Sequence, residues 1–232
     1  MSDGQTGRHS GERHRAGDTA RLNWLRAGVL GANDGIVATS GLVIGVAASG
    51  AATSAIATAG MAGLAAGALS MAAGEYVSVS TQRDTESAML AKERDELARF
   101  PEHELAELAG IYRAKGLPES LAQEVAVALT EHDALGAHAE AELGIDHEEL
   151  TNPWHAAGAS MLAFIVGSVL PLATILLLPD GFRVWATVAA AAVALGVTGW
   201  TSARLGGASV RTAVLRNVGG GLLAMAVTYG IG

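Results

Sequence analysis

Five long apolar stretches, separated by short turns and by one long polar segment, dominate the hydrophobic pattern of the chain. They cover residues 24–48, 56–80, 154–178, 182–203 and 213–231. Each is close to the roughly 20 residues that an α-helix needs to cross the apolar core of a bilayer. The pattern therefore predicts an all-α membrane protein with five transmembrane helices.

The long polar segment lies between the second and third apolar stretches and is strongly acidic. Residues 81–150 hold 17 acidic residues but only 6 lysines and arginines, a local charge of −11. Such a segment attracts cations and repels nucleic acids. We expect residues 81–152, called the insert below, to form a helical domain outside the membrane.

No strong turn signal separates the second apolar stretch from the insert, so we expect one helix to leave the membrane and continue to about residue 100. A second helical stretch to about residue 115 is either continuous with it or kinked at Pro101. A glycine and proline turn follows. A further helix is predicted from about residue 119 to Gly144, where the glycine is typical of a helix end.

Composition agrees with a membrane protein and narrows the chemistry. Half of the residues are apolar, 16% are charged and 30 are glycines. There is no cysteine, so a metal site must use oxygen, imidazole or thioether ligands. The sequence contains no phosphate-binding glycine loop, zinc-protease motif or nucleophile elbow. We therefore expect no enzymatic activity.

Arginine placement predicts the orientation in the membrane. Residues 1–22 are polar and basic and are expected to form a disordered tail. This tail and the turn between the last two spans carry most of the flanking arginines, whereas the opposite turns carry only Arg183. The positive-inside rule then places the amino terminus and the insert in the cytoplasm, and the carboxy terminus outside. Residues 23–80 would hold spans one and two, and residues 153–232 would hold spans three to five.

Two acidic residues, Asp34 and Glu75, lie deep in apolar stretches where no lysine or arginine shares their depth. A carboxylate there marks either a substrate or proton site, or an acid that is protonated or hydrogen-bonded to another helix. Asn33 and Gly35 flank Asp34, which favours a locally loosened helix. Met71 lies one turn before Glu75 on the same helical face, and its thioether favours softer transition metals. We predict a transport path through Asp34, Met71 and Glu75.

Four glutamates recur in the first part of the insert: Glu93, Glu96, Glu104 and Glu107. Their spacing places them on one helical face if the helix continues through Pro101. A solvated acidic surface is the alternative interpretation, but few basic residues accompany this face. The spacing therefore favours a cation-binding site made of carboxylates.

A second pair of candidate ligands lies at the end of the insert. His138 and Glu142 are four residues apart, so they share one helical face. Ordinary solvation explains most of the other acidic and histidine residues nearby. We include His138 and Glu142 among the predicted metal ligands.

Three sequence strings together resemble the vacuolar iron transporter (VIT) family: GANDGIV at 31–37, SMAAGEYVSVSTQRD at 70–84 and ELGI at 142–145. The resemblance covers about residues 24–231. It implies a dimer of five-span subunits that exchanges cytosolic ferrous iron, and often manganese, for protons. It also implies a helical cytoplasmic metal-binding domain between spans two and three. The sequence resembles a bacterial member of the family, which implies the plasma membrane rather than a vacuole.

Matched residue by residue, the resemblance implies path residues at Asp34 and Met71. It also implies metal ligands at Glu93, Glu96, Glu104, Glu107 and Glu142. The chain departs from plant members just before Glu142. Those members have two adjacent methionines where this chain has His138 and Ala139, so imidazole would replace a thioether.

The leading hypothesis is a ferrous iron or manganese exporter driven by inward proton movement. The alternative is a membrane-anchored metal sensor or buffer that transports nothing. Both need the glutamates of the insert, but only a transporter needs Asp34. A carrier of organic solutes would need no acidic insert. The glycine-lined faces of spans one and two favour close pairing of two subunits in a homodimer.

Overall fold

The computed structural model describes residues 16–146 and 151–232, and helices make up most of this part of the chain. The elements are α1 (Ala16–Ala48), α2 (Thr53–Arg99), α3 (Pro101–Ala114), α4 (Glu119–His138), the π-helix η1 (Ala139–Leu143), α5 (Pro153–Leu177), α6 (Asp180–Leu205) and α7 (Val210–Ile231). Within the described ranges, five helices are long and apolar enough to cross a membrane, namely α1, α2, α5, α6 and α7. The predicted all-α fold with five apolar spans is confirmed.

The amino-terminal boundary differs from the prediction. Helix α1 begins at Ala16, well before the apolar stretch that starts at residue 24. Most of the predicted tail, residues 1–15, lies outside the described residues. At the far end of the insert, the predicted break at Asn152 and Pro153 is confirmed, because the Asn152 side chain accepts a hydrogen bond from the Trp154 N–H and caps α5.

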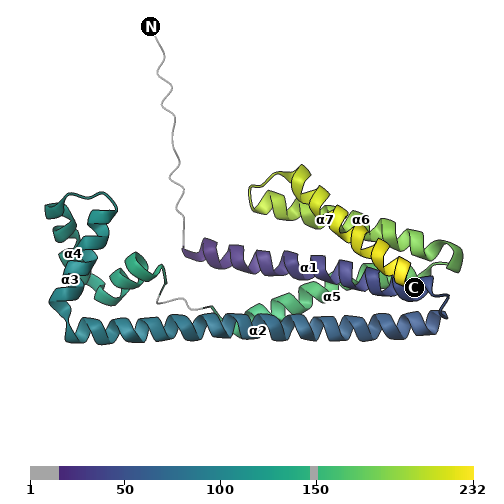
Figure 1. Cartoon of the computed structure of the whole chain (residues 1–232), viewed down its shortest axis with the longest axis horizontal. Helices are drawn as coiled ribbons and strands as arrows, with labels where there is room; N and C mark the ends of the chain where they lie inside the picture. The colour runs from purple at the N-terminus through teal and green to yellow at the C-terminus, as the bar shows by residue number, and fades with distance from the viewer. Residues whose placement is uncertain (1–15, 147–150) are drawn as a thin grey trace, which may run out of the picture.

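Helix α2 is the longest element and joins the two parts of the molecule (Figure 1). Its 47 residues correspond to about 70 Å of helix at 1.5 Å per residue. The first half packs with α1 and α5 in the apolar bundle, and the second half projects beyond the bundle and carries α3 and α4. One helix therefore does continue from the apolar bundle into the insert, as the sequence pattern predicted.

The helix ends at Arg99, and α3 begins at Pro101 in a new direction. Phe100 has φ −134° and ψ 49°, outside the helical region. Proline has no N–H to continue the ladder, and its ring disfavours helical geometry in the residue before it. The condition for a single acidic face is therefore not met, and the prediction that the four glutamates share one face of one helix is wrong.

A close crossing of α1 and α5 holds the apolar bundle together. A Cβ at Gly35 would clash with the carbonyl oxygen of Phe164, and one at Gly167 would clash with that of Ala32. The Ser168 hydroxyl lies within hydrogen-bond distance of two carbonyl oxygens, that of Gly35 across the crossing at 3.2 Å and that of Phe164 on its own helix at 2.8 Å. Helix α1 is continuous here, so the expected loosening around Asp34 does not occur. Gly35 instead allows α5 to approach.

The glycines of α2 also pack within the subunit. A Cβ at Gly60, Gly63 or Gly67 would meet side chains of α1 or α5, including that of Phe164. Small residues permit such close packing between membrane helices. The glycines of α2 therefore serve packing against α1 and α5 within the single chain, and Gly63 and Gly67 remain partly exposed.

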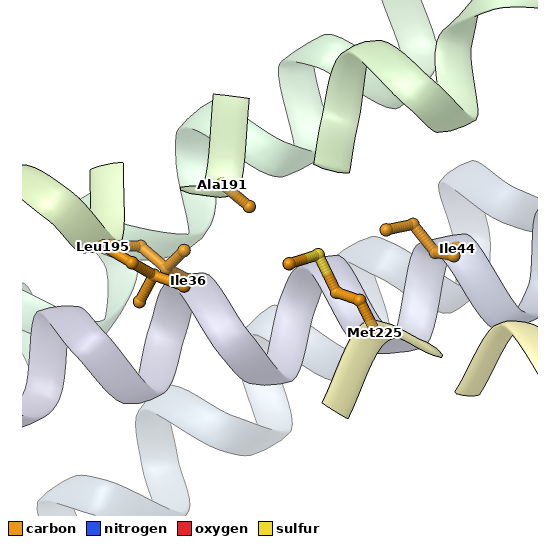
Figure 2. Close-up of a cluster of buried hydrophobic side chains, with 5 residues drawn as sticks. All are labelled: Ile36, Ile44, Ala191, Leu195 and Met225. Carbon is orange, nitrogen blue, oxygen red and sulfur yellow. The ribbon is translucent and has the colours of Figure 1, made fainter. Parts of the chain in front are cut away.

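The opposite side of α1 packs on α6 and α7. Figure 2 shows that side chains from the three helices converge there: Ile36, Ile44, Ala191, Leu195 and Met225. All five are nearly inaccessible to solvent. Helix α1 thus lies between α5 on one side and the α6–α7 pair on the other.

Aromatic side chains mark both ends of the bundle. Tyr76 of α2 and Trp154 of α5 lie with ring centroids 4.6 Å apart at the end nearest the insert. Trp185 of α6 and Tyr229 of α7 are paired at 6.3 Å at the opposite end. Tyrosine and tryptophan favour the two membrane–water interfaces. The apolar core of the bilayer therefore corresponds to the bundle between these pairs.

The crossing gives a first testable prediction. Gly167→Ala should lower the thermal stability of the purified protein, because the new methyl group meets backbone rather than a movable side chain. Overpacking of this kind costs about 1–3 kcal/mol. Gly158→Ala, on the same helix, is the control because a Cβ there meets open space. Equal melting temperatures for the two variants in detergent would contradict the packing described here.

Candidate functional site

Three predicted ligands converge in the insert from three different helices. Glu93 lies near the end of α2, Glu104 in the first turn of α3, and His138 at the end of α4. All three are buried, and ligand atoms of all three lie within 4.8 Å of one another. The Nδ1 atom of His138 is 2.9 Å from a carboxylate oxygen of Glu93 and 3.9 Å from one of Glu104.

A break in α4 directs His138 toward the two glutamates. Asp133 has φ −158° and ψ 93°, which interrupts the helix. Its carboxylate accepts a hydrogen bond from the Gly136 N–H at 3.0 Å and caps the next turn. The chain then widens into η1, and Gly144 ends it in the left-handed conformation with φ 65°. The predicted glycine stop is confirmed.

A small apolar core holds α3 against α4 beneath the site. Its buried members are Leu108, Ala109 and Ala126, with Tyr112 and Leu129 packed at the edge. Leu108 and Ala126 are fully inaccessible to solvent. This packing fixes the two helices that carry Glu104 and His138, so the ligand atoms are brought together before any cation binds.

The polar atoms at the centre lack ordinary partners. His138 Nδ1, His138 Nε2 and Glu93 Oε1 are buried, and none makes a hydrogen bond with suitable direction to a described residue. Nδ1 and Oε1 are close, but the N–H direction does not point at the carboxylate. For metal–ligand bonds of about 2.1 Å, neighbouring ligand atoms lie about 3.0–3.4 Å apart. The 2.9 Å between His138 Nδ1 and the Glu93 oxygen is close to this spacing, and the 3.9 Å to the Glu104 oxygen is longer.

The other predicted ligands of the insert lie around this centre. A Glu142 oxygen is 3.7 Å from His138 Nδ1. Glu107 is exposed one turn after Glu104. Glu96 turns away and forms a 3.0 Å ion pair with Lys92. The structure thus brings Glu142 to the buried site, leaves Glu107 at its rim and gives Glu96 another partner.

The sequence analysis did not single out His103. Its exposed ring lies 3.7 Å from a Glu104 oxygen and 4.0 Å from a Glu107 oxygen, so these three residues form a second cluster of ligand atoms at the surface. The spacing of four residues between His103 and Glu107 was the signal that could have identified it. Glu104 belongs to both clusters.

Burial raises the pKa of the Glu93 carboxyl above its usual value. The positive charge that His138 can carry opposes this rise, whereas the carboxylates of Glu142, Glu104 and Glu96 add to it. Burial therefore favours the protonated form of Glu93 more than exposure to solvent would. A cation that binds must displace that proton.

A cavity of about 190 Å³ lies within the apolar bundle, between α1, α2 and α5. Asp34 and Met71, two of the predicted path residues, both line it, together with Thr39, Ser70 and Phe164. Asp34 is exposed on the surface of the single chain, and Met71 is half-buried. The structure therefore brings the predicted carboxylate and thioether to one space.

Glu75 occupies a different position. It is half-buried, and it is absent from the lining of this cavity within the part of the chain that the structure describes. It directly precedes Tyr76, whose ring marks the end of the bundle nearest the insert. Asp34 and Glu75 therefore do not face each other across the cavity, and Glu75 lies between the cavity and the insert.

Comparisons with known proteins agree over nearly the whole chain. A family model described as "VIT family" matches residues 25–232. A vacuolar iron transporter of Acanthamoeba castellanii is 42% identical over 223 residues, which cover 96% of this chain and 82% of that protein. Vacuolar iron transporter homolog 1 of Oryza sativa subsp. japonica is 38% identical, with 97% of this chain and 79% of that protein covered. Its namesake in Arabidopsis thaliana is 37% identical, with 91% and 82% covered.

The raised pKa of Glu93 gives a second prediction. In the metal-free protein, a folded-state pKa above the usual 4.5 stabilises the fold at low pH, and this contribution is lost as the pH rises through the raised value. Glu93→Gln is permanently neutral, so without metal it should melt at a higher temperature than the wild type at pH 7. The difference should shrink toward pH 4.5.

Glu96→Gln is the control, since its carboxylate pairs with Lys92 at the surface. Thermal melts with a chelator present measure the effect. Identical melting temperatures for Glu93→Gln and wild type across this pH range would contradict the assignment of a destabilising buried carboxyl.

Proposed function

The chain belongs to the VIT family, and from this premise we propose that it is a membrane transporter of ferrous iron. It exports the ion from the cytosol in exchange for protons, and manganese is a second substrate. The observation that carries the proposal is the shared cavity of Asp34 and Met71 in the apolar bundle, on the same helix α2 that presents Glu93 in the insert.

Transport begins at the insert. Its local charge of −11 concentrates cations near the surface. The buried carboxylates of Glu93 and Glu104 and the imidazole of His138 then replace part of the hydration shell of the ion. Oxygen and imidazole ligands suit ferrous iron and manganese. The arginine distribution supports an insert and an amino terminus in the cytoplasm, with the carboxy terminus outside.

The path continues along α2. Met71 and Glu93 are separated by about 33 Å of helix at 1.5 Å per residue. Glu75 lies between them at the level of the aromatic ring of Tyr76, where it can receive the ion as it enters the bundle. Met71 lies one turn further in, at the wall of the cavity. Asp34 completes this inner binding site from α1.

Proton coupling follows from the chemistry of a carboxylate. Asp34 binds the cation when ionised and releases it when protonated from the outer side. The nearest side chains that line the cavity carry no positive charge. Competition between proton and metal at one carboxylate is sufficient to link the two fluxes in opposite directions.

The protein acts as a homodimer in this proposal, in the plasma membrane of a bacterial cell. Asp34, Ala38 and Leu42 line the cavity and are exposed on the single chain. A second subunit that covers this face would separate the path from lipid.

A third prediction separates transport from binding alone. Asp34→Asn preserves the shape of the side chain but removes the negative charge, which in the proposed cycle is neutralised first by the metal ion and then by a proton. It should abolish metal flux and coupled proton flux in proteoliposomes, while the insert still binds metal. Asp95→Asn is the control, because Asp95 is exposed on α2 and paired with Arg99. Undiminished flux in Asp34→Asn would remove Asp34 from the path, and a wild type with binding but no flux would favour a sensor.

A fourth prediction concerns the insert. Glu93→Gln combined with Glu104→Gln should reduce metal affinity of the full-length protein at least about tenfold, because each lost charge-assisted contact contributes roughly 1.5–3 kcal/mol. His138→Ala should have a smaller effect than this pair. Glu102→Gln combined with Glu124→Gln removes the same charge from exposed positions of the insert. Calorimetric affinities that are equal for the two double variants would overturn the assignment.

A further inference from the structure

Thr39 differs from the other threonines of the membrane helices. Threonine hydroxyls in such helices usually donate to a backbone carbonyl one turn earlier. Six threonines of the bundle follow this pattern, with their acceptors three or four residues earlier: Thr58, Thr174, Thr187, Thr198, Thr201 and Thr228. The Thr39 hydroxyl is buried, with 3% of the residue exposed, and makes no hydrogen bond to any described residue.

The two local acceptors of Thr39 are already used by serines. Its partner four residues earlier would be the Gly35 carbonyl, which lies 3.2 Å from the Ser168 hydroxyl of α5, a group that also lies 2.8 Å from the Phe164 carbonyl of its own helix. Its partner three residues earlier would be the Ile36 carbonyl, which accepts from the Ser40 hydroxyl. Each of these carbonyls also lies within the hydrogen-bond ladder of α1, and a carbonyl has two lone pairs. Another hydroxyl therefore lies within hydrogen-bond distance of each carbonyl, and Thr39 bonds to neither.

Thr39 is one of the residues that line the cavity shared by Asp34 and Met71, and its hydroxyl is buried beside that cavity. A hydroxyl without a partner in an apolar environment is costly, so its retention there indicates a ligand that the cavity receives. The cavity of about 190 Å³ has room for a cation with some of its water. Hydroxyl oxygen is a hard ligand and complements the soft thioether.

We propose that Thr39 is a further ligand of the transported cation, and that Ser168 and Ser40 are positioning residues that keep its hydroxyl free. The inference rests on the proposed transport path. It adds an oxygen donor on α1, beside Asp34 and opposite Met71 of α2. Together the three donors form a mixed hard and soft set, which suits divalent ions of manganese and iron better than calcium or magnesium.

The test measures initial metal flux into proteoliposomes as a function of metal concentration. Thr39→Val keeps the shape but lacks the hydroxyl, and we expect it to raise the KM for Mn²⁺ about tenfold, the upper range for one lost hydrogen-bond-strength contact. Thr39→Ser retains the hydroxyl and should stay within about twofold of the wild type. Thr187→Val is the matched control, because Thr187 is buried, bonded to Arg183 and away from the cavity.

Two further readouts distinguish ligation from a purely structural role. The KM for Cd²⁺, a softer ion, should change less than that for Mn²⁺ in Thr39→Val, because the thioether remains. Ser168→Ala frees a lone pair of the Gly35 carbonyl for Thr39, so it should raise the Mn²⁺ KM in the same direction. Its effect should vanish in the Thr39→Val background, since the two changes act on one hydroxyl.

Thermal melts and size-exclusion chromatography first establish that each variant is folded and has the size of the wild type. The fluxes are compared only after that. The inference fails if the wild type transports and Asp34→Asn does not, yet Thr39→Val keeps the wild-type KM for Mn²⁺. It also fails if Thr39→Val and Thr187→Val raise the KM equally. An unchanged KM in Ser168→Ala overturns the role of Ser168. Absence of flux in the wild type contradicts the proposed function itself, which is a separate outcome.

Discussion

The backbone contact between α1 and α5 is the constraint on which the apolar bundle depends. Gly35 and Gly167 leave no room for a side chain, and Ser168 adds a hydrogen bond across the crossing. Inside a bilayer, contacts of this kind replace the hydrophobic driving force that water supplies elsewhere. Since Asp34 neighbours Gly35, the residue that allows the helices to meet also sets the position of the Asp34 carboxylate beside the cavity.

The insert uses the opposite arrangement, in which polar groups are gathered at the centre and apolar groups support them. Leu108 and Ala126 pack α3 on α4, and this packing keeps Glu93, Glu104 and His138 close despite the cost of burying like charges. The raised pKa of Glu93 reflects that cost. Binding of a proton or of a cation lowers this electrostatic cost, so the two compete for the same carboxylates. Stability of the empty insert and affinity for metal are therefore opposing properties of the same residues.

The sequence predicted the apolar spans well because their length is fixed by the thickness of a bilayer, and Asn152 with Pro153 marked the start of α5 correctly. It also singled out Glu93, Glu104 and His138, which the structure brings together in the insert. It could not predict which carboxylates converge, because that depends on the change of direction at Phe100 and on the break at Asp133. The sequence also could not predict that the Thr39 hydroxyl has no partner, because this depends on how Ser168 of α5 packs against α1.

The continuity of α2 has a consequence for how this protein can change in evolution. Within a straight helix, insertion of one residue turns everything beyond it by about 100° and moves it by about 1.5 Å. A single insertion between Met71 and Glu93 would therefore point the carboxylate away from α3 and α4. Seven added residues would nearly restore the direction but would lift the insert about 10 Å further from the bilayer. Length variation in relatives should thus concentrate in the turns, and this segment of α2 should remain constant in length.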